Sequence, residues 1–435
     1  MRLSPALLAW HHLAGLLAPG LRWNLRRRVA RGKEESARLP EREGHGADRP
    51  KGRLIWLHAA SVGESLAILP LLEALAERDP ALNMLVTTGT VTSARLLPQR
   101  LSAALRGRVT HRYAPLDVPA WVERFLDGWR PDAAAFVESE LWPNTLAAAA
   151  GRGIPLALLN ARISDRTARR WERWAPGFAR ELLGRFRVIM PRSAEDEARL
   201  LALGARAVTT PGDLKLAAPP LPVEEGALAA LRSAIGGRPV LLAASTHPGE
   251  EAQILAVAET LRQARPELLT ILAPRHPERG AELGAAPRRG LGALPDAGPT
   301  YIADTMGEMG LLYRVADLAV IGGSLVPHGG QNPLEAARLG CPMVFGPHMQ
   351  NFREATAGLL AAGGARQVAD TAALAATVAD MLTNPHEAAT MARAAGDWVA
   401  AGSGLPGRMA EALLALTGPE GASGQSWAQV QGRKV

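Results

Sequence analysis

The sequence predicts an α/β protein with two Rossmann-like domains, whose parallel sheets face each other across a cleft, and an N-terminal membrane-anchor helix. From Arg53 onward, short apolar runs typical of buried strands alternate with stretches of helical periodicity. The layout then repeats: Glu64 precedes Pro80 by 16 residues, Glu250 precedes Pro266 by 16 residues, and each Glu follows a Gly. The strand-to-helix turns of such sheets lie where ligands bind, so we expect both turns at the cleft.

The individual elements follow from local patterns. An apolar run predicts a strand over 54–58, and leucines on one face predict a helix over 61–78. Further strands of the first half are predicted at 83–88, 133–138, 156–160, 188–191 and 207–210. In the second half we predict a strand over 239–244, a helix over 248–263 and a strand over 268–273.

The domain boundaries are predicted from composition. Pro219, Pro220 and Pro222 interrupt the pattern and indicate a linker over 218–223. This divides the chain into an anchor with a basic collar (1–50), a first domain (51–217), a second domain (224–420) and a tail (421–435).

The net charge of +7 is concentrated at the N-terminus. Residues 1–53 hold twelve Arg or Lys against five acidic residues, and the rest of the chain is neutral in sum. Residues 3–21 are mostly apolar and run into Arg22, Arg26, Arg27, Arg28 and Arg31. The stretch is about the length of a membrane span but contains histidines and prolines, so spanning the bilayer and lying at an anionic lipid surface both remain open. Charge confined to one end disfavours a nucleic-acid partner.

Several classes of chemistry are disfavoured by what the sequence lacks. Cys341 is the one cysteine, which excludes an intrachain disulfide framework or a Cys-cluster zinc site. No G-x-G-x-x-G follows the first strand and no Asp-x-Asp pair occurs, so we expect neither a dinucleotide cofactor nor a metal held on a nucleotide diphosphate.

The densest motif of the second half combines two glycine-rich segments, residues 322–324 and 329–335. Paired glycines let backbone N–H groups approach a phosphate. Asn332 as N-cap and Pro333 at the first helical position would begin a helix running to Gly340, whose positive end favours an anion. Whether Asn332 and Glu335 only cap that helix or also bind a ligand remains open.

An ordered series of short motifs covering roughly residues 50–360 resembles the 3-deoxy-D-manno-octulosonic acid (Kdo) transferases. The motifs are HAASVGE at 58–64, ESELWPN at 138–144, NARIS at 160–164, GDLK at 212–215, STHPGE at 245–250, PRHPER at 274–279, DTMGE at 304–308, GGS at 322–324, GGQNPLE at 329–335 and GPH at 346–348. The resemblance implies a GT-B glycosyltransferase, inverting and without metal or cofactor. It also implies transfer of Kdo from CMP-Kdo to the lipid A precursor lipid IVA at the cytoplasmic face of the inner membrane.

The resemblance assigns catalytic roles to Glu64, Glu138 and Lys215. Glu64 matches the general base, although Ser61 to Glu64 is also a capping box by pattern. Glu138 and Lys215 match groups that stabilise the transition state, and Lys215 is one of four lysines in the chain. Glu138 and Glu140 end the same strand, so which of them points into the cleft remains open.

The CMP contacts implied by the resemblance lie in three segments of the second half. They are Pro274, Arg275 and His276; Met306, Gly307 and Glu308; and Asn332, Pro333, Leu334 and Glu335. Arg275 is suited to a phosphate oxygen. Ser245, Thr246 and Ser324 are expected nearby.

The sequence departs from the commonest family form in places. Gln331 replaces a usual His, Asp213 stands where Asn or Ser is frequent, and Ser139 replaces Thr, while residues 285–299 predict a different surface loop. Two alternatives remain: another GT-B sugar-nucleotide transferase or epimerase, and a membrane-tethered sugar-nucleotide binder without catalysis.

Overall fold

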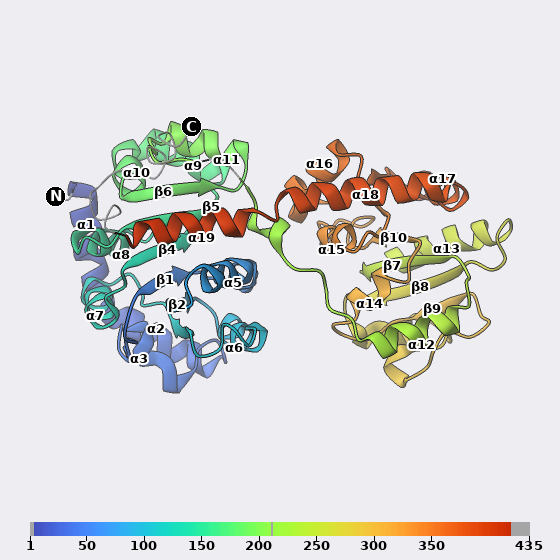
Figure 1. Ribbon diagram of the computed structural model, residues 1–435, viewed down its shortest axis with the longest axis horizontal. Helices are drawn as coiled ribbons and strands as arrows, with labels where there is room; N and C mark the ends of the chain where they lie inside the picture. Colours follow the sequence, from blue (N-terminus) through green and yellow to red (C-terminus); the bar gives the residue numbers. More distant parts are fainter. Residues whose placement is uncertain (1–3, 210–211, 419–435) are drawn as a thin grey trace. The chain divides into compact units, whose positions relative to one another are not determined.

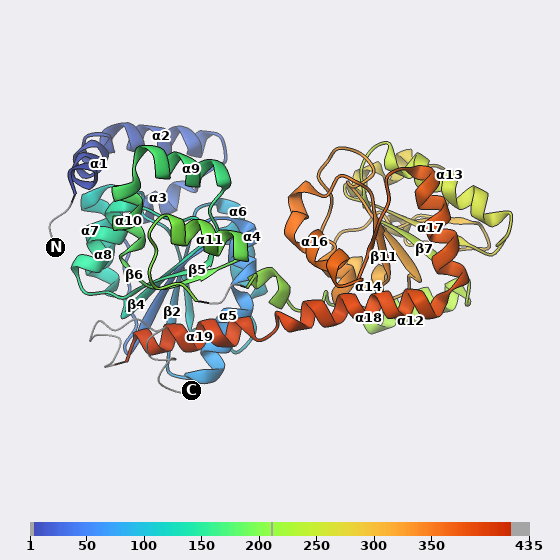
Figure 2. The ribbon, with the colours of Figure 1, turned by 90° about the horizontal axis from the view of Figure 1, so that it is seen from above.

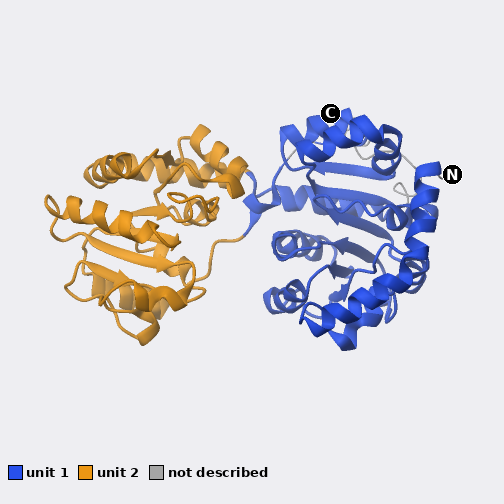
Figure 3. Ribbon diagram, turned by 180° about the vertical axis from the view of Figure 1, so that it is seen from behind, with its two compact units in different colours: residues 1–218, 402–435 blue, residues 219–401 orange. Residues whose placement is uncertain are grey.

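The computed structural model describes residues 4–209 and 212–418 and divides into two compact units (Figure 3). The first contains the chain up to Ala218 and from Gly402 onward, and the second spans Pro219–Ala401. In the described residues each unit is built on a six-stranded sheet in which every pair of neighbouring strands is parallel. The predicted pair of Rossmann-like domains is confirmed.

The sheet of the first unit has the order β3-β2-β1-β4-β5-β6. Its strands are β1 Leu54–His58, β2 Asn83–Thr88, β3 Val109–Tyr113, β4 Ala133–Val137, β5 Leu156–Ala161 and β6 Phe186–Pro191. The chain reverses its direction of winding between β1 and β4. Ligands bind beyond the carboxyl ends of strands at such a switch point, and the turns after β1 and β4 carry Glu64 and Glu138.

The sheet of the second unit has the same topology, in the order β12-β11-β10-β7-β8-β9. Its strands are β7 Val240–Thr246, β8 Leu269–Pro274, β9 Thr300–Ile302, β10 Leu318–Ile321, β11 Met343–Phe345 and β12 Arg366–Gln367. The switch point here lies between β7 and β10, where the STHPGE and GGS motifs follow the two strands.

Helices cover the sheets of both units (Figures 1 and 2). In the first unit they are α1 Pro5–Leu16, α2 Ala18–Ala30, α3 Leu39–Arg42, α4 Val62–Ala67, α5 Leu69–Arg78, α6 Val91–Arg100, α7 Pro119–Trp129, α8 Pro143–Gly151, α9 Asp165–Trp174, α10 Pro176–Leu183, α11 Ala194–Ala202 and α19 Leu405–Leu416. In the second they are α12 Glu225–Ile235, α13 Glu250–Arg262, α14 Met309–Tyr313, α15 Leu334–Arg338, α16 Arg353–Ala361, α17 Thr371–Thr383 and α18 Pro385–Ala401.

Three predicted elements differ in the structure. The helix over 61–78 is divided at Ile68 into α4 and α5, because Pro70 lies in the first turn of α5 and has no N–H to continue the helix. The strand predicted over 207–210 is reduced to one bridge between Val208 and Ile189, and Thr210 lies outside the described residues. The helix predicted from Asn332 to Gly340 forms only over α15.

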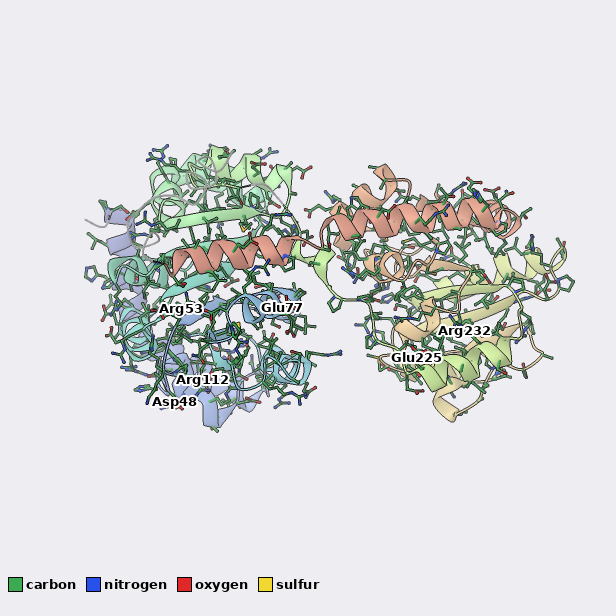
Figure 4. All side chains as sticks on the ribbon, viewed as in Figure 1. Asp48, Arg53, Glu77, Arg112, Glu225 and Arg232 are labelled. Carbon is green, nitrogen blue, oxygen red and sulfur yellow. The ribbon has the colours of Figure 1, made fainter. Side chains whose placement is uncertain are left out.

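The second domain was predicted to run to residue 420, but α19 packs in the first unit (Figure 1). Its buried side chains Leu405, Met409 and Leu413 join the core cluster formed by α5 and the sheet. At the start of β1, Arg53, labelled in Figure 4, donates to Thr417 just after α19 and also pairs with Asp79. The physical reason for the difference is burial: the apolar face of α19 has its partner in the first unit. The predicted tail lies outside the described residues.

The basic N-terminal segment is built into the first unit. Arg42, which the sequence placed in the collar, is buried, pairs with buried Glu34 and donates to the carbonyl oxygens of Thr88, Gly89 and Ala114. The apolar stretch forms two helices, α1 and α2, separated at Leu17. Among the helices of the described ranges, none combines the length and hydropathy needed for a membrane crossing.

Candidate functional site

Glu64 lies at the start of α4, in the turn that follows β1. Its carboxylate accepts hydrogen bonds from the Ala60 amide at 2.8 Å and the Ser61 hydroxyl at 2.6 Å, and Ser61 Oγ in turn accepts from the Glu64 amide. The capping interpretation therefore holds, with the return bond going to Ala60 rather than Ser61. The side chain is half-buried, so the cap does not remove the carboxylate from the surface.

Glu138 follows β4 in the left-handed region, with φ of 58°. Burial raises the pKa of its carboxyl, and the charge of Glu64 raises it further, while Lys215, Arg192 and Arg162 act to lower it. Two of the residues predicted to be catalytic, Glu64 and Lys215, thus both act on the charge of the third, Glu138, within the first unit. Burial and a neighbouring carboxylate are two of the causes that favour the protonated form of a carboxyl group. Neither Arg162 nor Arg192 was singled out from the sequence.

Lys215 lies in a 3₁₀ turn, η2 Leu214–Ala217, that is fixed from two sides. The Asp213 carboxylate accepts from the Lys215 amide at 2.9 Å, and Asn160 Oδ1 at the end of β5 accepts from the Leu214 amide at 3.0 Å. Leu214 also belongs to the core cluster that contains Leu405 of α19. Asn160 begins the NARIS motif and is a functional candidate to which the sequence assigned no role.

The Glu140 side chain has different partners from that of Glu138. Its Oε2 accepts from Trp142 Nε1 at 2.6 Å and lies 3.3 Å from His58 Nε2, and His58 Nδ1 lies 2.9 Å from Thr87 Oγ1. Burial acts to raise the pKa of Glu140, but the hydrogen bond and charge of His58 outweigh it and lower the pKa. Of the two glutamates, Glu138 is therefore the one grouped electrostatically with Glu64.

In the second unit, Glu250 occupies the position that the repeat equates with Glu64, but it is fully buried. Its carboxylate accepts from the His247 amide at 2.9 Å and from three consecutive amides, those of Gly323, Ser324 and Leu325, at 2.6–3.0 Å. The expectation that the first glycine pair offers its amides to a phosphate is corrected: Gly322 donates to Ala244 O, and the next three amides are used by Glu250.

The predicted donor residues lie at the carboxyl edge of the second sheet and in its loops. Pro274 is buried at the end of β8, and Arg275 and His276 are exposed just beyond it. Met306 is 70% exposed and Gly307 is left-handed, with φ of 83°. Arg289 forms a two-point ion pair with Glu308 and, through its hydrogen bonds, lowers the pKa of that carboxyl; Arg289 belongs to the loop that the sequence predicted to differ.

The third predicted donor segment lies beside the first. Burial raises the pKa of Glu335, whereas the hydrogen bond from Asn332 and the charges of Arg338 and Arg275 act to lower it. Asn332 was predicted as the N-cap with Pro333 at the first helical position, but Pro333 is the N-cap of α15 and the helix begins one residue later. Asn332 Oδ1 still accepts from the Leu334 amide at the start of the helix, and the charge interaction links Glu335 with Arg275.

Three imidazoles lie close to these segments. His247 stacks on His328 at 4.2 Å between ring centroids and meets His276 edge-on at 6.2 Å, and Gln331 Nε2 lies 2.8 Å from His247 Nε2. Burial first, and then the charge of His328, lower the pKa of His247. No group of His, Cys, Asp or Glu side chains suited to a metal ion is found across the described ranges.

Comparison with known proteins places these motifs in one family. Residues 37–218 match the family model described as 3-deoxy-D-manno-octulosonic-acid transferase (kdotransferase). The chain is 35% identical over 403 residues to a probable mitochondrial 3-deoxy-D-manno-octulosonic acid transferase of Arabidopsis thaliana, covering 88% of this chain and 89% of that protein. It is 36% identical over 387 residues to the 3-deoxy-D-manno-octulosonic acid transferase of Bordetella pertussis, covering 86% and 89%.

A solved structure shares the architecture without close sequence similarity. UDP-GlcNAc 2-epimerase from Neisseria meningitidis bound to UDP-GlcNAc covers 83% of this chain and 99% of its own, with 15% identity and a TM-score of 0.56. At that identity the likeness shows the fold alone, and it confirms the predicted fold class. The sequence relatives identify the family: the chain belongs to the 3-deoxy-D-manno-octulosonic acid transferases.

Proposed function

We propose that this protein transfers Kdo from CMP-Kdo to lipid IVA by a single displacement that inverts the anomeric centre. The bond between the anomeric carbon of Kdo and the CMP phosphate oxygen breaks, and its electron pair leaves with CMP. A bond forms from an acceptor hydroxyl oxygen to that carbon. Glu64 takes the hydroxyl proton as general base, a role that contributes roughly 10² to 10⁴ in rate.

The single observation that carries the proposal is the gathering of Glu64 and Lys215 close enough to Glu138 to act on its charge. Glu64 is half-buried and each of its oxygens accepts one hydrogen bond, so both retain lone pairs, whereas the two oxygens of Glu250, its counterpart in the repeat, accept from four backbone amides. Lys215 provides a compact positive charge near Glu138, suited to charge that develops in the transition state.

The donor is assigned to the second unit. Arg275 would contact the CMP phosphate, with Pro274 and His276 beside it, and the other contacts would come from residues 306–308 and 332–335. The charge interaction between Arg275 and Glu335 supports one common site for the first and third segments. An arginine at a strand end suits a phosphate oxygen because its planar fork can donate twice.

The lipid acceptor is supported by the surface of α1 and α2. Large apolar side chains with at least 40% exposure gather here: Leu8, Trp10, Leu13, Leu16, Leu17 and Trp23. Exposed arginines lie on the same helices, at positions 22, 26 and 27. Leu and Trp together with basic groups are typical of a helix lying at an anionic lipid surface, and we propose the cytoplasmic face of the inner membrane as the location.

Release of CMP from CMP-Kdo in the presence of lipid IVA, with mass measurement of the lipid, tests the proposal. Glu64→Gln should lower turnover roughly 10²- to 10⁴-fold while CMP binding is retained. Glu77→Gln, an exposed glutamate on α5 labelled in Figure 4, serves as the matched control and should keep wild-type turnover. Wild-type protein that leaves the lipid mass unchanged would contradict the proposal.

A further inference from the structure

The first unit contains a cavity of about 300 Å³ at the carboxyl edge of its sheet, beneath α2. The volume is at the lower end of the range for ligand pockets. Its wall is formed by α2, the buried pair Glu34 and Arg42, residues of β1 and β4, the turns after β1, β2, β3 and β4, and the start of α8. The hydrophobic members are Leu21, Leu25, Trp56, Phe136, Leu116 and Trp142.

The buried polar groups in the wall already have partners, and Asn24 is exposed. His58 lies against Thr87 and Glu140, and Arg42 is paired with Glu34. Asp117 accepts from Thr145 and from the amide of Asn144. A ligand therefore meets few polar groups that require a bond from it, and the wall favours a hydrocarbon over a sugar or a phosphate.

The exposed apolar surface of α1 and α2 reaches the cavity wall along α2, whose N-cap is Leu17. Leu17, Leu21 and Leu25 are four residues apart and so form one stripe, which runs from the 51%-exposed Leu17 to the buried Leu25. Arg28 continues the stripe, lines the cavity and pairs with Glu34, and Arg26 and Arg27 are exposed beside it. Cationic groups next to an apolar pocket complement an anionic lipid, whose chain is apolar and whose head carries negative charge.

The cavity also adjoins the proposed base. Ala60 lines it, and the Ala60 amide donates to the Glu64 carboxylate at 2.8 Å. A chain held in the cavity would keep the head of its lipid close to Glu64. Positioning of this kind lowers the activation barrier because the entropy cost of bringing the reacting groups together is met on binding.

We propose that this cavity holds one acyl chain of the lipid acceptor and so positions the acceptor head at Glu64. The inference rests on the proposed function for the identity of the lipid. Each methylene buried changes affinity roughly fourfold, so the loss of a few buried methylenes is measurable as a rise in KM.

The kinetic test fills the cavity from two sides. Leu21→Trp and Ala114→Leu each add volume at a lining position, and Leu201→Trp adds it at a half-exposed site on α11 remote from the cavity. With fully acylated acceptor, both filling variants should raise KM at least tenfold with little change in kcat, and Leu201→Trp should match wild type. With acceptor whose ester-linked chains have been removed by alkali, the KM of the wild type should rise toward that of the filling variants. Equal KM for both acceptors, or unchanged KM in two folded filling variants, overturns the proposal.

A second measurement does not depend on turnover. A ten-carbon fatty acid with a diazirine at its terminal carbon is photolysed with the full chain, and the labelled peptides are mapped by mass spectrometry. Labels at Leu116 or Phe136, lost in Ala114→Leu, support the cavity, whereas labels confined to residues 8–17, which do not line it, overturn the proposal. If no acceptor releases CMP but the cavity is labelled, the proposed function fails and the acyl site stands.

Discussion

The two glutamates that mark the internal repeat predict opposite outcomes for the same substitution. Glu250→Ala would remove the buried acceptor of four amide donors: those of Gly323 and Ser324, which are buried, and those of His247 and Leu325, which are partly buried. At about 1 kcal/mol for each donor, the expected loss of stability is about 4 kcal/mol, which is large for one substitution. Glu64→Ala removes a half-exposed cap and should cost only about 1 kcal/mol.

Differential scanning calorimetry distinguishes the two outcomes. In a domain of this size each kcal/mol lowers Tm by about 2–4 °C, so Glu250→Ala should lower the affected transition by about 8–16 °C and Glu64→Ala by about 2–4 °C. Because a chain with two units need not unfold in one step, the comparison is made on the transition that moves. Glu259→Ala, which alters an exposed glutamate of the same helix, should shift Tm by less than about 2 °C. Equal shifts for Glu64→Ala and Glu250→Ala would refute the reasoning.

Three further predictions concern positioning and pH. Asn160→Ala removes the acceptor of the Leu214 amide and should lower kcat about tenfold or more, whereas Asn160→Asp, which keeps an acceptor oxygen, should retain more activity in the same CMP-release assay. Because the pKa of Glu138 is raised in the folded protein, the stabilisation from this protonated carboxyl is lost as pH rises above the ordinary carboxyl pKa. Glu138→Gln should therefore make Tm depend less on pH above that value. The same substitution should lower kcat about 10²- to 10³-fold. Burial, and then the charge of Arg38, lower the pKa of His111 to about 4, so this histidine should cost about 3 kcal/mol of stability as pH falls from about 6.5 to 4, read from urea midpoints, and His111→Gln should lessen that loss.

Most of the predicted strands are buried on both faces, although the short, fully buried strands β10 and β11 were not predicted. β1 and β2 match their predicted bounds residue for residue, because every position of β1 is buried and the apolar run is unbroken. β3 was not predicted: it lies at the edge of the sheet and reads Val-Thr-His-Arg-Tyr, with four of its five residues only half-buried. An edge strand is defined by its neighbour's hydrogen bonds, which a pattern within one segment does not contain.

Contacts between segments distant in sequence account for the remaining differences. α19 has an ordinary amphipathic pattern, and only the presence of α5 and the first sheet determines which unit covers its apolar face. The N-terminal segment was predicted as a membrane anchor with a basic collar, but Arg42 within it pairs with Glu34, donates to three carbonyl oxygens and is buried. The net charge of a segment does not distinguish an exposed arginine from a paired one.

The motifs predicted the residues of the candidate site, but they did not predict that Glu64 is half-exposed while Glu250 is buried. Glu64 and Glu250 both follow a glycine and lie at equal spacing from a proline, yet one is half-exposed and the other is buried beneath a loop that begins more than 70 residues later. The difference depends on whether the strand on the opposite side of the switch point is followed by a turn whose amides reach the glutamate. In the second unit, the turn after β10 supplies three amides to Glu250.

Backbone strain marks the same edge of both sheets. Besides Arg130, which caps a helix, the non-glycine residues with positive φ in the described ranges are Glu138, Asn160 and Ser245, with φ of 51–58°. Each lies at the carboxyl end of a strand within a family motif, and a left-handed residue with a side chain costs of order 1 kcal/mol. Glycine would relieve that cost but would remove the carboxylate at 138 and the amide that fixes Leu214 at 160. At positions 138 and 160 the side chain therefore does what glycine could not, which adds Asn160 to the candidate residues that the motifs had assigned.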